Sequence, residues 1–419
     1  MRRYWRDRAL WMTIADALAI LAALALPWST SLLAIFVACW LGAVAWVVDW
    51  GAYVRLLKRP ICYLPLALVG LAVIGTLWSD AAWGARLYAI SPTLKLLVLP
   101  WLFYHFARSS RGIWVFVAFL ASCVLLMLMS WLVAMYPGLS LKSGEEAARG
   151  IFVKNYIDQS QEFALCAVAL AYPVVRLLRT DRIWAALALG ALSLGFIANM
   201  AFVIVSRTAI VTMPIMLAVF SLLHLRRRTS LIVVGATIAL GALLWFTTTD
   251  LRWGPKSLVR DYQQYKTEKT VTSIGLRLEF WQKSLRFISE APVIGHGTGS
   301  MRALFERAAT EYREGPPGSV IANPHNQTLA VAVQWGAVGV ILLYAMWLVH
   351  LLLFRGEGLV AWIGLLVVVQ NVFTSLFNSH IFDFHQGWMY VLGVGVAGGM
   401  VLRAGSGGED GELRGITRS

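Results

Sequence analysis

The chain has 419 residues, of which 59% are hydrophobic and only 14% are charged. Water-soluble domains carry about a quarter charged residues, so this composition excludes an ordinary soluble fold. The formal net charge is +14, but the basic residues gather in short segments between apolar runs, a pattern typical of cytoplasmic membrane-protein loops rather than of nucleic-acid binding.

Apolar runs of roughly 17 to 25 residues recur along the chain, and each can cross about 30 Å of hydrocarbon. We expect spans at residues 9–26, 30–49, 60–78, 93–107, 112–136, 159–178, 183–204, 208–225, 230–247, 326–353, 358–377 and 386–402. The sequence therefore predicts an all-α polytopic membrane protein with about twelve transmembrane helices. The fourth expected span is short and the tenth is long, which predicts a tilt or an interruption in both.

One long loop divides the expected spans into two groups. The predicted division is a nine-span bundle at 1–247, a loop at 248–325, a three-span part at 326–402 and a tail at 403–419. Amphipathic helical patterns in the loop at residues 278–288 and 301–312 predict helices that lie on the membrane surface. The tail is rich in glycine and charge, which predicts disorder.

Alternate connections between the expected spans are rich in basic residues. Arg55, Arg108, Arg179, Arg226 and Arg355 all fall on one side of the membrane if the chain has twelve spans. The positive-inside rule makes this side cytoplasmic, together with both termini. The long loop is then expected on the outer side.

Arg207 interrupts a nearly continuous apolar stretch from Ile183 to Leu225. As helix this stretch is about 65 Å long, enough for two crossings, and cytoplasmic arginines flank both ends. Its middle therefore reaches the outer face with almost no aqueous loop. A functional arginine is the favoured interpretation, and an arginine that snorkels to the headgroups at a hairpin tip is the alternative.

His325 lies in Asn323-Pro-His-Asn326, where the long loop returns to the membrane. Asn323 followed by Pro324 predicts a helix start, which places His325 in the first turn. A histidine with a pKa near about 6.5 can accept a proton at neutral pH, and a helix N-terminus disfavours its charged form. A capping or packing histidine is the alternative.

Other polar residues carry weaker signals. A solvated helix face is the favoured interpretation of Glu279 and an equal alternative for Arg277. The segment from Gly295 to Gly299 faintly resembles a phosphate loop but lacks the Gly-Lys-Ser/Thr ending, so a plain loop is favoured and an anion cradle of backbone N–H groups stays open.

Two further groups could in principle hold a metal. His380, Asp383 and His385 have a spacing that permits a metal site, but capping of a tight hairpin is the favoured interpretation. The four cysteines show no CxxC pairing, so neither a disulfide nor a metal framework is expected.

These features together resemble the O-antigen ligase family, the WaaL-type ligases, which are related to O-antigen polymerases and bacterial protein O-oligosaccharyltransferases. The resemblance rests on the spans, the central arginine, Arg277-Leu-Glu-Phe-Trp281, the Gly-x-Gly-x-Gly turn and Pro324-His-Asn326. It implies a GT-C-like glycosyltransferase in the inner membrane of a Gram-negative bacterium, with a periplasmic active site and no cofactor or metal.

The resemblance also implies the reaction and the residues that perform it. O-antigen polysaccharide would pass from undecaprenyl diphosphate to a sugar hydroxyl of lipid A–core oligosaccharide, with inversion at the anomeric carbon. His325 is the expected base, and Arg207 and Arg277 are expected to bind the diphosphate, since arginine can bind phosphate in a bidentate way. Possible supporting residues are Asn326, Glu279, Trp281 and His296.

Three other functions remain as alternatives. An O-antigen polymerase would use the same donor, a protein O-oligosaccharyltransferase would glycosylate protein, and a lipid-linked glycan transporter would need charges inside several spans. Such charges are scarce, since Asp16 and Glu162 are isolated or close to span ends. The sequence leaves open whether four further basic residues join the site, namely Arg86, Lys95, Arg149 and Lys154.

Overall fold

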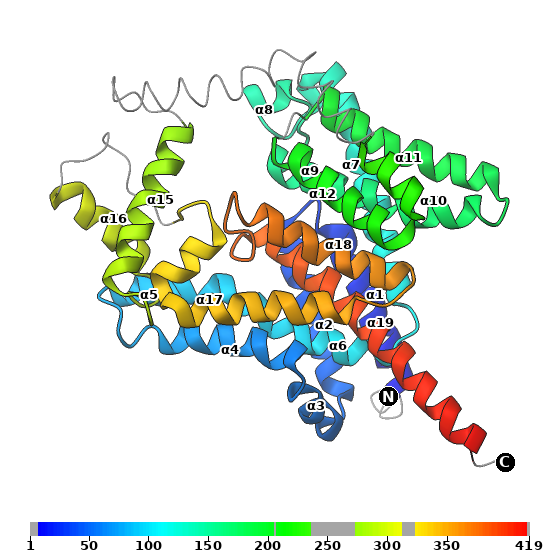
Figure 1. The fold of residues 1–419 in the computed structure, drawn as a ribbon, viewed down its shortest axis with the longest axis horizontal. Helices are drawn as coiled ribbons and strands as arrows, with labels where there is room; N and C mark the ends of the chain where they lie inside the picture. Colours follow the sequence, from blue (N-terminus) through cyan, green and yellow to red (C-terminus); the bar gives the residue numbers. More distant parts are fainter. Residues whose placement is uncertain (1–6, 205–206, 236–272, 312–322, 417–419) are drawn as a thin grey trace.

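A computed structural model describes residues 7–204, 207–235, 273–311 and 323–416, and this part of the chain is helical and contains no strand (Figure 1). The elements in chain order are α1 (Arg8–Ala25), α2 (Thr30–Val47), α3 (Trp50–Leu57), α4 (Pro60–Ile74), α5 (Trp83–Ile90), the 3-10 helix η2 (Ser91–Val98), α6 (Leu99–Phe106), α7 (Gly112–Met135), the 3-10 helix η3 (Pro137–Leu139), α8 (Glu145–Ala148), α9 (Tyr156–Ala169), α10 (Ala171–Leu178), α11 (Ile183–Phe202), α12 (Arg207–His224), α15 (Ser273–Glu290), α16 (Ser300–Glu311), α17 (Gln327–Leu353), α18 (Leu359–Thr374) and α19 (Phe384–Ile416).

The all-helical membrane fold predicted from the sequence is confirmed in outline. Within the described residues, eight helices are long and apolar enough to cross a membrane, and α3 and α4, bent by 78°, form a ninth candidate together. The spans expected at 208–225 and 358–377 correspond to shorter apolar helices at Thr212–His224 and Leu359–Thr374. The span expected at 230–247 extends beyond the described residues. The structure thus supports a multi-pass protein with eight or nine candidate spans.

The two spans of unusual length are both irregular. The fourth begins at Trp83 and passes through η2 before α6, because Pro92 and Pro100 cannot donate backbone hydrogen bonds. The tenth is α17, which is interrupted at Gly336, where φ is 58° and ψ is −153°. An interruption of the α-helix, rather than tilt alone, therefore explains the unusual lengths of the fourth and tenth expected spans.

A loop from the preceding segment fills the break in α17. The N–H groups of Ala337 and Val338, beyond the break, donate to the carbonyls of Pro292 and Val293 at 2.8 and 3.2 Å. This loop comprises residues 292–299, and we call it the 292–299 loop. A Cβ at Gly336 would overlap the Val293 carbonyl, so only glycine permits this close approach.

The same loop is unable to form the anion cradle left open by the sequence. The N–H groups of His296 and Gly297 donate to the Val333 and Gln334 carbonyls at 2.9 and 2.8 Å, and that of Thr298 donates to the Gly75 carbonyl at 2.9 Å. The N–H of Gly299 donates to the Gln334 side chain at 3.0 Å. These four donors are already engaged, so the loop is a structural clamp.

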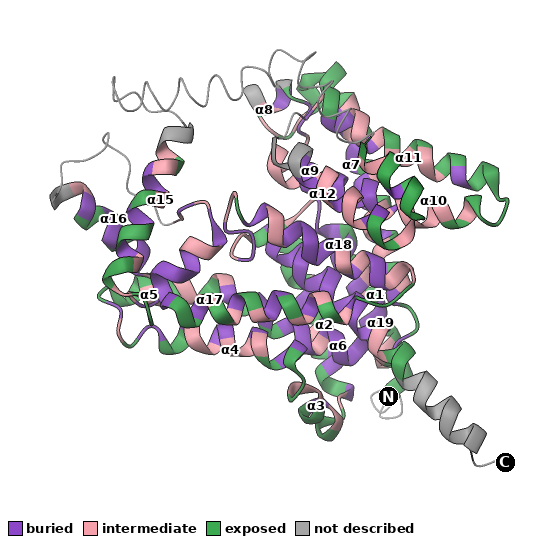
Figure 2. Ribbon diagram, viewed as in Figure 1, coloured by how far each residue is buried: buried purple, intermediate pink, exposed green. Residues whose placement is uncertain are grey.

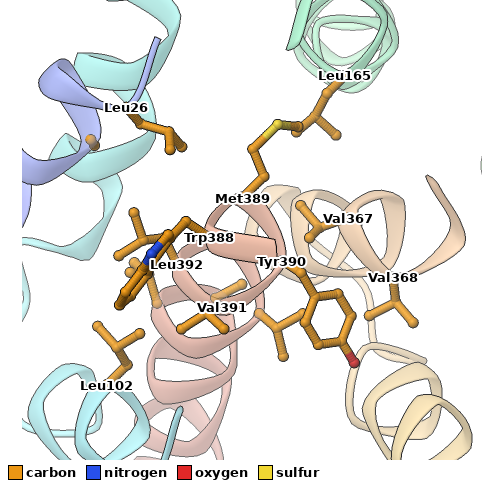
Figure 3. Close-up of a cluster of buried hydrophobic side chains, with 14 of the residues drawn as sticks. Leu26, Leu102, Leu165, Val367, Val368, Trp388, Met389, Tyr390, Val391 and Leu392 are labelled. Atoms are coloured by element: carbon orange, nitrogen blue, oxygen red, sulfur yellow. The ribbon is translucent and has the colours of Figure 1, made fainter. Parts of the chain in front are cut away.

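Buried residues concentrate where α19 crosses the middle of the bundle (Figure 2). Here α19 packs between α6 and α18, and Figure 3 shows its side chains directed toward Leu102 on one side and Val367 on another. A Cβ at Gly395 would overlap Leu102, and one at Gly398 would overlap Phe103. Small residues therefore let α6 approach α19 closely, as in many membrane helix pairs.

α15 and α16 lie together at one end of the bundle, and both chain ends lie away from it (Figure 1). We call this end the loop end. Phe280, Phe287 and Phe305 bind α15 and α16 to the start of α17 through a separate small core. At the other end α19 continues as a helix to Ile416, where the sequence predicts a disordered tail. Each residue added to an existing helix gains one backbone hydrogen bond without a new nucleation step, so α19 can continue into the tail.

Candidate active site

His325 lies in the turn before α17 and is half-buried. The helix begins at Gln327, because the Asn326 side chain caps it and accepts a hydrogen bond from the Leu329 N–H at 3.1 Å. The predicted helix start at Asn323 and Pro324 is therefore wrong, and His325 precedes the first turn.

The backbone of His325 is held in the left-handed region, with a φ of 55°. Asn323 stabilises this conformation, since its Oδ1 accepts hydrogen bonds from the His325 N–H at 2.9 Å and from Ser379 Oγ at 2.8 Å. A non-glycine residue in this region is uncommon, and such strain often gathers at functional sites.

The turn between α18 and α19, residues 375–383, orients the imidazole. His325 Nδ1 lies 3.1 Å from Asn378 Oδ1, and Asn378 Nδ2 donates to Asp383 Oδ2 at 2.7 Å. An ionised carboxylate can only accept, so the amide nitrogen of Asn378 must face Asp383 and its oxygen must face His325. Nδ1 therefore carries the proton, and Nε2 keeps the lone pair that a general base needs.

Side chains of α15 enclose His325 from one side. The rings of Phe280 and His325 are stacked, with centroids 6.5 Å apart, and Trp281 Nε1 donates to the Pro324 carbonyl at 3.1 Å. Burial lowers the pKa of His325 below its ordinary value, the hydrogen bond with Asn378 opposes this, and the charge of Arg277 lowers the pKa further. Burial, rather than the predicted helix N-terminus, is thus the largest cause of the lowered pKa of His325.

Of the two arginines expected to bind phosphate, the structure describes the side chain of Arg277 but only the backbone of Arg207. Arg277 is exposed on α15, close enough for its charge to act on His325. Arg207 is the first residue of α12, and only a short connection separates it from the end of α11 at Phe202. Two helices therefore occupy this apolar stretch, as the sequence predicts, but the side chain of Arg207 lies outside the described residues.

Glu279 does not lie on a solvated helix face, so that prediction is wrong. It is buried and forms an ion pair of 2.5 Å with Lys283, which is buried as well. His296 also serves packing, since its Nε2 donates to the Phe287 carbonyl at 2.8 Å and lies 4.0 Å from Glu290. Asn326, besides capping α17, donates to the Leu376 carbonyl at 3.2 Å. The contacts of Glu279, His296 and Asn326 thus stabilise the segments that surround His325.

Lys95, whose role the sequence leaves open, supports the 375–383 turn. Its buried ammonium donates to the carbonyls of Ile381 at 3.1 Å, of Phe382 at 3.3 Å, and of Asp383. An ammonium has three donors, so the turn uses all of them. In the sequence, the only indication of this anchoring role is that Lys95 is a charged residue within the apolar span expected at 93–107.

Glu162, which appears isolated in the sequence, belongs to a buried cluster. His385 Nε2 donates to its carboxylate, and His385 Nδ1 accepts from Lys154 Nζ at 2.6 Å. We call Lys154, His385 and Glu162 the Lys154 cluster. Burial lowers the pKa of Lys154, and the charges of Glu162 and Asp158 oppose this shift. The half-buried Lys154 and the buried Glu162 thus lie on either side of His385.

The three residues whose spacing permits a metal site, His380, Asp383 and His385, do not lie together. His380 Nδ1 lies 3.2 Å from Asp383 Oδ2, whereas His385 contacts Glu162 and Lys154. Hairpin packing, the favoured interpretation, describes this arrangement.

The two remaining basic residues have local partners. Arg86 donates to the carbonyls of Ala81 and Thr76 at 2.6 and 2.9 Å and lies 4.6 Å from the centre of the Trp83 ring. Arg149 lies over the Tyr156 ring at 5.9 Å. Neither contact connects these arginines to His325.

Comparisons with known proteins identify one segment of the chain. Residues 192–344 match the family model described as O-antigen ligase (Wzy_C), and this segment contains Arg207, Arg277 and His325. The curated proteins contain no match to the chain. Residues 192–344 of this multi-pass helical membrane protein are thus similar to the O-antigen ligase (Wzy_C) family.

Proposed function

We propose that this protein is an O-antigen ligase, a GT-C-like glycosyltransferase that transfers O-antigen polysaccharide from undecaprenyl diphosphate to a sugar hydroxyl of lipid A–core oligosaccharide. The observation that carries this proposal is the 3.1 Å contact between His325 Nδ1 and Asn378 Oδ1, from which we infer a proton on Nδ1 and a free lone pair on Nε2. The positive charge of Arg277 lies nearby, in the same family segment.

In the proposed reaction, His325 Nε2 accepts the proton of the acceptor hydroxyl while its oxygen attacks the anomeric carbon. The bond from this carbon to the diphosphate oxygen breaks, and its electron pair leaves with the diphosphate. Attack opposite the leaving group inverts the anomeric configuration. The guanidinium groups of Arg277 and Arg207 neutralise the charge that develops on the leaving group.

We further propose that the site faces the periplasm, with both termini in the cytoplasm of a Gram-negative bacterium. Both substrates are lipid-linked, so the reacting groups must meet at a membrane surface. Two observations support this arrangement: His325 lies beside α15, and the α17–α18 connection that carries Arg355 lies at the opposite end of the bundle from the loop end (Figure 1).

The direct test combines the purified chain, lipid-linked O-antigen and rough lipopolysaccharide in the presence of EDTA. The proposal expects O-antigen on lipopolysaccharide, and no product from a His325 variant. Transfer that EDTA abolishes would contradict a reaction based on arginine and histidine alone. Product only on a second lipid-linked glycan would identify a polymerase, product on protein an O-oligosaccharyltransferase, and glycan movement without transfer a transporter.

A further inference from the structure

The short helix α3 lies at the end of α4 that is opposite to the loop end (Figure 1). It connects two expected spans, because α2 ends at Val47 and α4 begins at Pro60. Arg59 takes the extended conformation that a following proline favours, and this separates the two helices. α4 occupies the span expected at 60–78, so the bend of 78° between α3 and α4 directs α3 along the membrane surface.

Aromatic rings hold one side of α3 against the bundle. Tyr53 is buried, and the centre of its ring lies 4.6 Å from that of Trp101 and 5.7 Å from that of Tyr104. Asp49 caps the helix and accepts a hydrogen bond from the Ala52 N–H at 3.1 Å, while its own N–H donates to the Tyr104 hydroxyl at 2.6 Å. α3 therefore has a fixed position, and its remaining side chains form a defined surface.

The outward side chains of α3 are either apolar or cationic. Trp50 and Val54 lie one helical turn apart and are 59% and 51% exposed. The cations of this segment, Arg55, Lys58 and Arg59, are exposed as well. We call these five residues the α3 surface. Tryptophan beside basic residues is typical of helices that lie in a membrane interface.

Further positive charge reaches α3 from other parts of the chain. Arg8 donates to the last carbonyl of α2 at 2.7 Å. The guanidinium of Arg108 lies 3.7 Å from the centre of the Tyr104 ring, whose hydroxyl contacts Asp49. Backbone hydrogen bonds lower the pKa of Asp49, and the charges of Arg55 and Arg108 lower it further. Cations from three segments therefore surround this carboxylate, and an excess of positive charge faces the solvent.

We propose that the α3 surface binds the headgroups of anionic phospholipids in the cytoplasmic leaflet, with Trp50 and Val54 inserted between the lipids. Guanidinium groups bind phosphate through charge-assisted hydrogen bonds. We choose a lipid over an acidic protein because the surface is apolar as well as cationic and lies at the level of the membrane surface. The inference rests on the proposed orientation and is independent of the proposed reaction.

Photo-crosslinking tests which lipid contacts α3. p-Benzoylphenylalanine is placed at Val54, or at Leu125 near the middle of α7, which is similarly exposed at 53%. The full chain is reconstituted in phosphatidylcholine vesicles that contain phosphatidylglycerol as the minor lipid of both leaflets, so the result does not depend on the orientation. The proposal expects phosphatidylglycerol adducts several-fold above its share of the vesicle lipid from position 54, and at that share from position 125. The same share at both positions would overturn it.

Charge variants show whether the cations of α3 cause this enrichment. Each cation near an anionic surface contributes about fivefold, so Arg55→Gln combined with Arg59→Gln should reduce the enrichment at position 54 to nearly the vesicle share. Arg226→Gln combined with Arg227→Gln removes two exposed cations after α12 and should leave the enrichment unchanged. Lysine at positions 55 and 59 should preserve it. Equal enrichment in both glutamine variants would contradict the inference.

The same probe in intact cells tests the alternative occupant. A discrete protein adduct from position 54, in place of phospholipid, would mean that a protein covers α3 and would overturn the proposal.

The lipid site and the ligase reaction fail independently, because crosslinking requires no turnover. Enrichment of phosphatidylglycerol in a chain that performs no transfer would leave the lipid site standing and reject the ligase. Transfer without enrichment would reject the lipid site alone.

Discussion

Replacement of His325 by asparagine separates its proton chemistry from its backbone conformation. Asparagine tolerates the left-handed φ of 55° but cannot serve as a base at neutral pH. We expect kcat to fall by about 10²- to 10⁴-fold, the usual contribution of general base catalysis, with little change in donor binding. Single-turnover kinetics measures the first quantity and equilibrium binding of undecaprenyl diphosphate the second. Retention of the full rate would rule out His325 as the base.

The pH dependence of kcat/KM should report the pKa of His325. Burial lowers this pKa, so we expect the proposed base to stay unprotonated, and transfer to continue, down to a pH below the ordinary histidine value of about 6.5. Activity should be lost only as the pH falls through the lowered pKa.

Asn378→Asp supplies a matched test of that assignment. A carboxylate next to Nδ1 stabilises the imidazolium, so the pKa of His325 rises and the acid limb moves to higher pH. The comparison needs complete pH profiles of both proteins under the same conditions. Coincident acid limbs would mean that another group controls the rate.

Lys95 supports the 375–383 turn by hydrogen bonds, and this turn orients His325 through Asn378. In Lys95→Met, the carbonyls of residues 381–383 lose their donor, at a cost of about 1–3 kcal/mol for each buried group left unsatisfied. We expect lower thermal stability and a reduced kcat. Lys58→Met, at an exposed lysine, is the control for the loss of charge. Equal melting temperatures for the two variants would exclude the anchoring role.

The break in α17 should tolerate no side chain at Gly336. Gly336→Ala would force its Cβ against the Val293 carbonyl in a left-handed conformation, which predicts a loss of roughly 1–3 kcal/mol. Gly190→Ala is the matched control, since Gly190 is helical with open space around it. Thermal unfolding in detergent compares the two. A neutral Gly336→Ala would mean that the 292–299 loop does not require this geometry.

Hydropathy predicts most of the helices because each span must bury its backbone polar groups in hydrocarbon. The division of the apolar stretch into α11 and α12 follows from its length alone. By contrast, the contact between His325 and Asn378 joins residues 53 apart, and His385 and Glu162 are 223 apart. No local pattern encodes such pairs. Gly336 is likewise one glycine within an apolar run, and only the docked loop makes it a break.

At the scale of the whole molecule, the proposed orientation can be measured with a membrane-impermeant maleimide. Ser289→Cys in α15 and Gly356→Cys after α17 are both exposed positions, in segments that we place on opposite sides of the membrane. Intact spheroplasts should label only the first, and lysed membranes both. The native thiols of Cys62, Cys123 and Cys166 are buried and should stay unlabelled. Labelling of position 356 in intact spheroplasts would reverse the orientation.

The docking of the 292–299 loop into α17 also has a consequence for biogenesis. When α17 leaves the ribosome, the N–H groups of Ala337 and Val338 have no helical partners, because their acceptors belong to Pro292 and Val293. The 292–299 loop must therefore already lie against α17 before these donors can be buried. Insertion of this helix and folding of the segment before it are thus coupled, and a C-terminal fragment beginning at α17 would enter the bilayer with an unpaired backbone at its break.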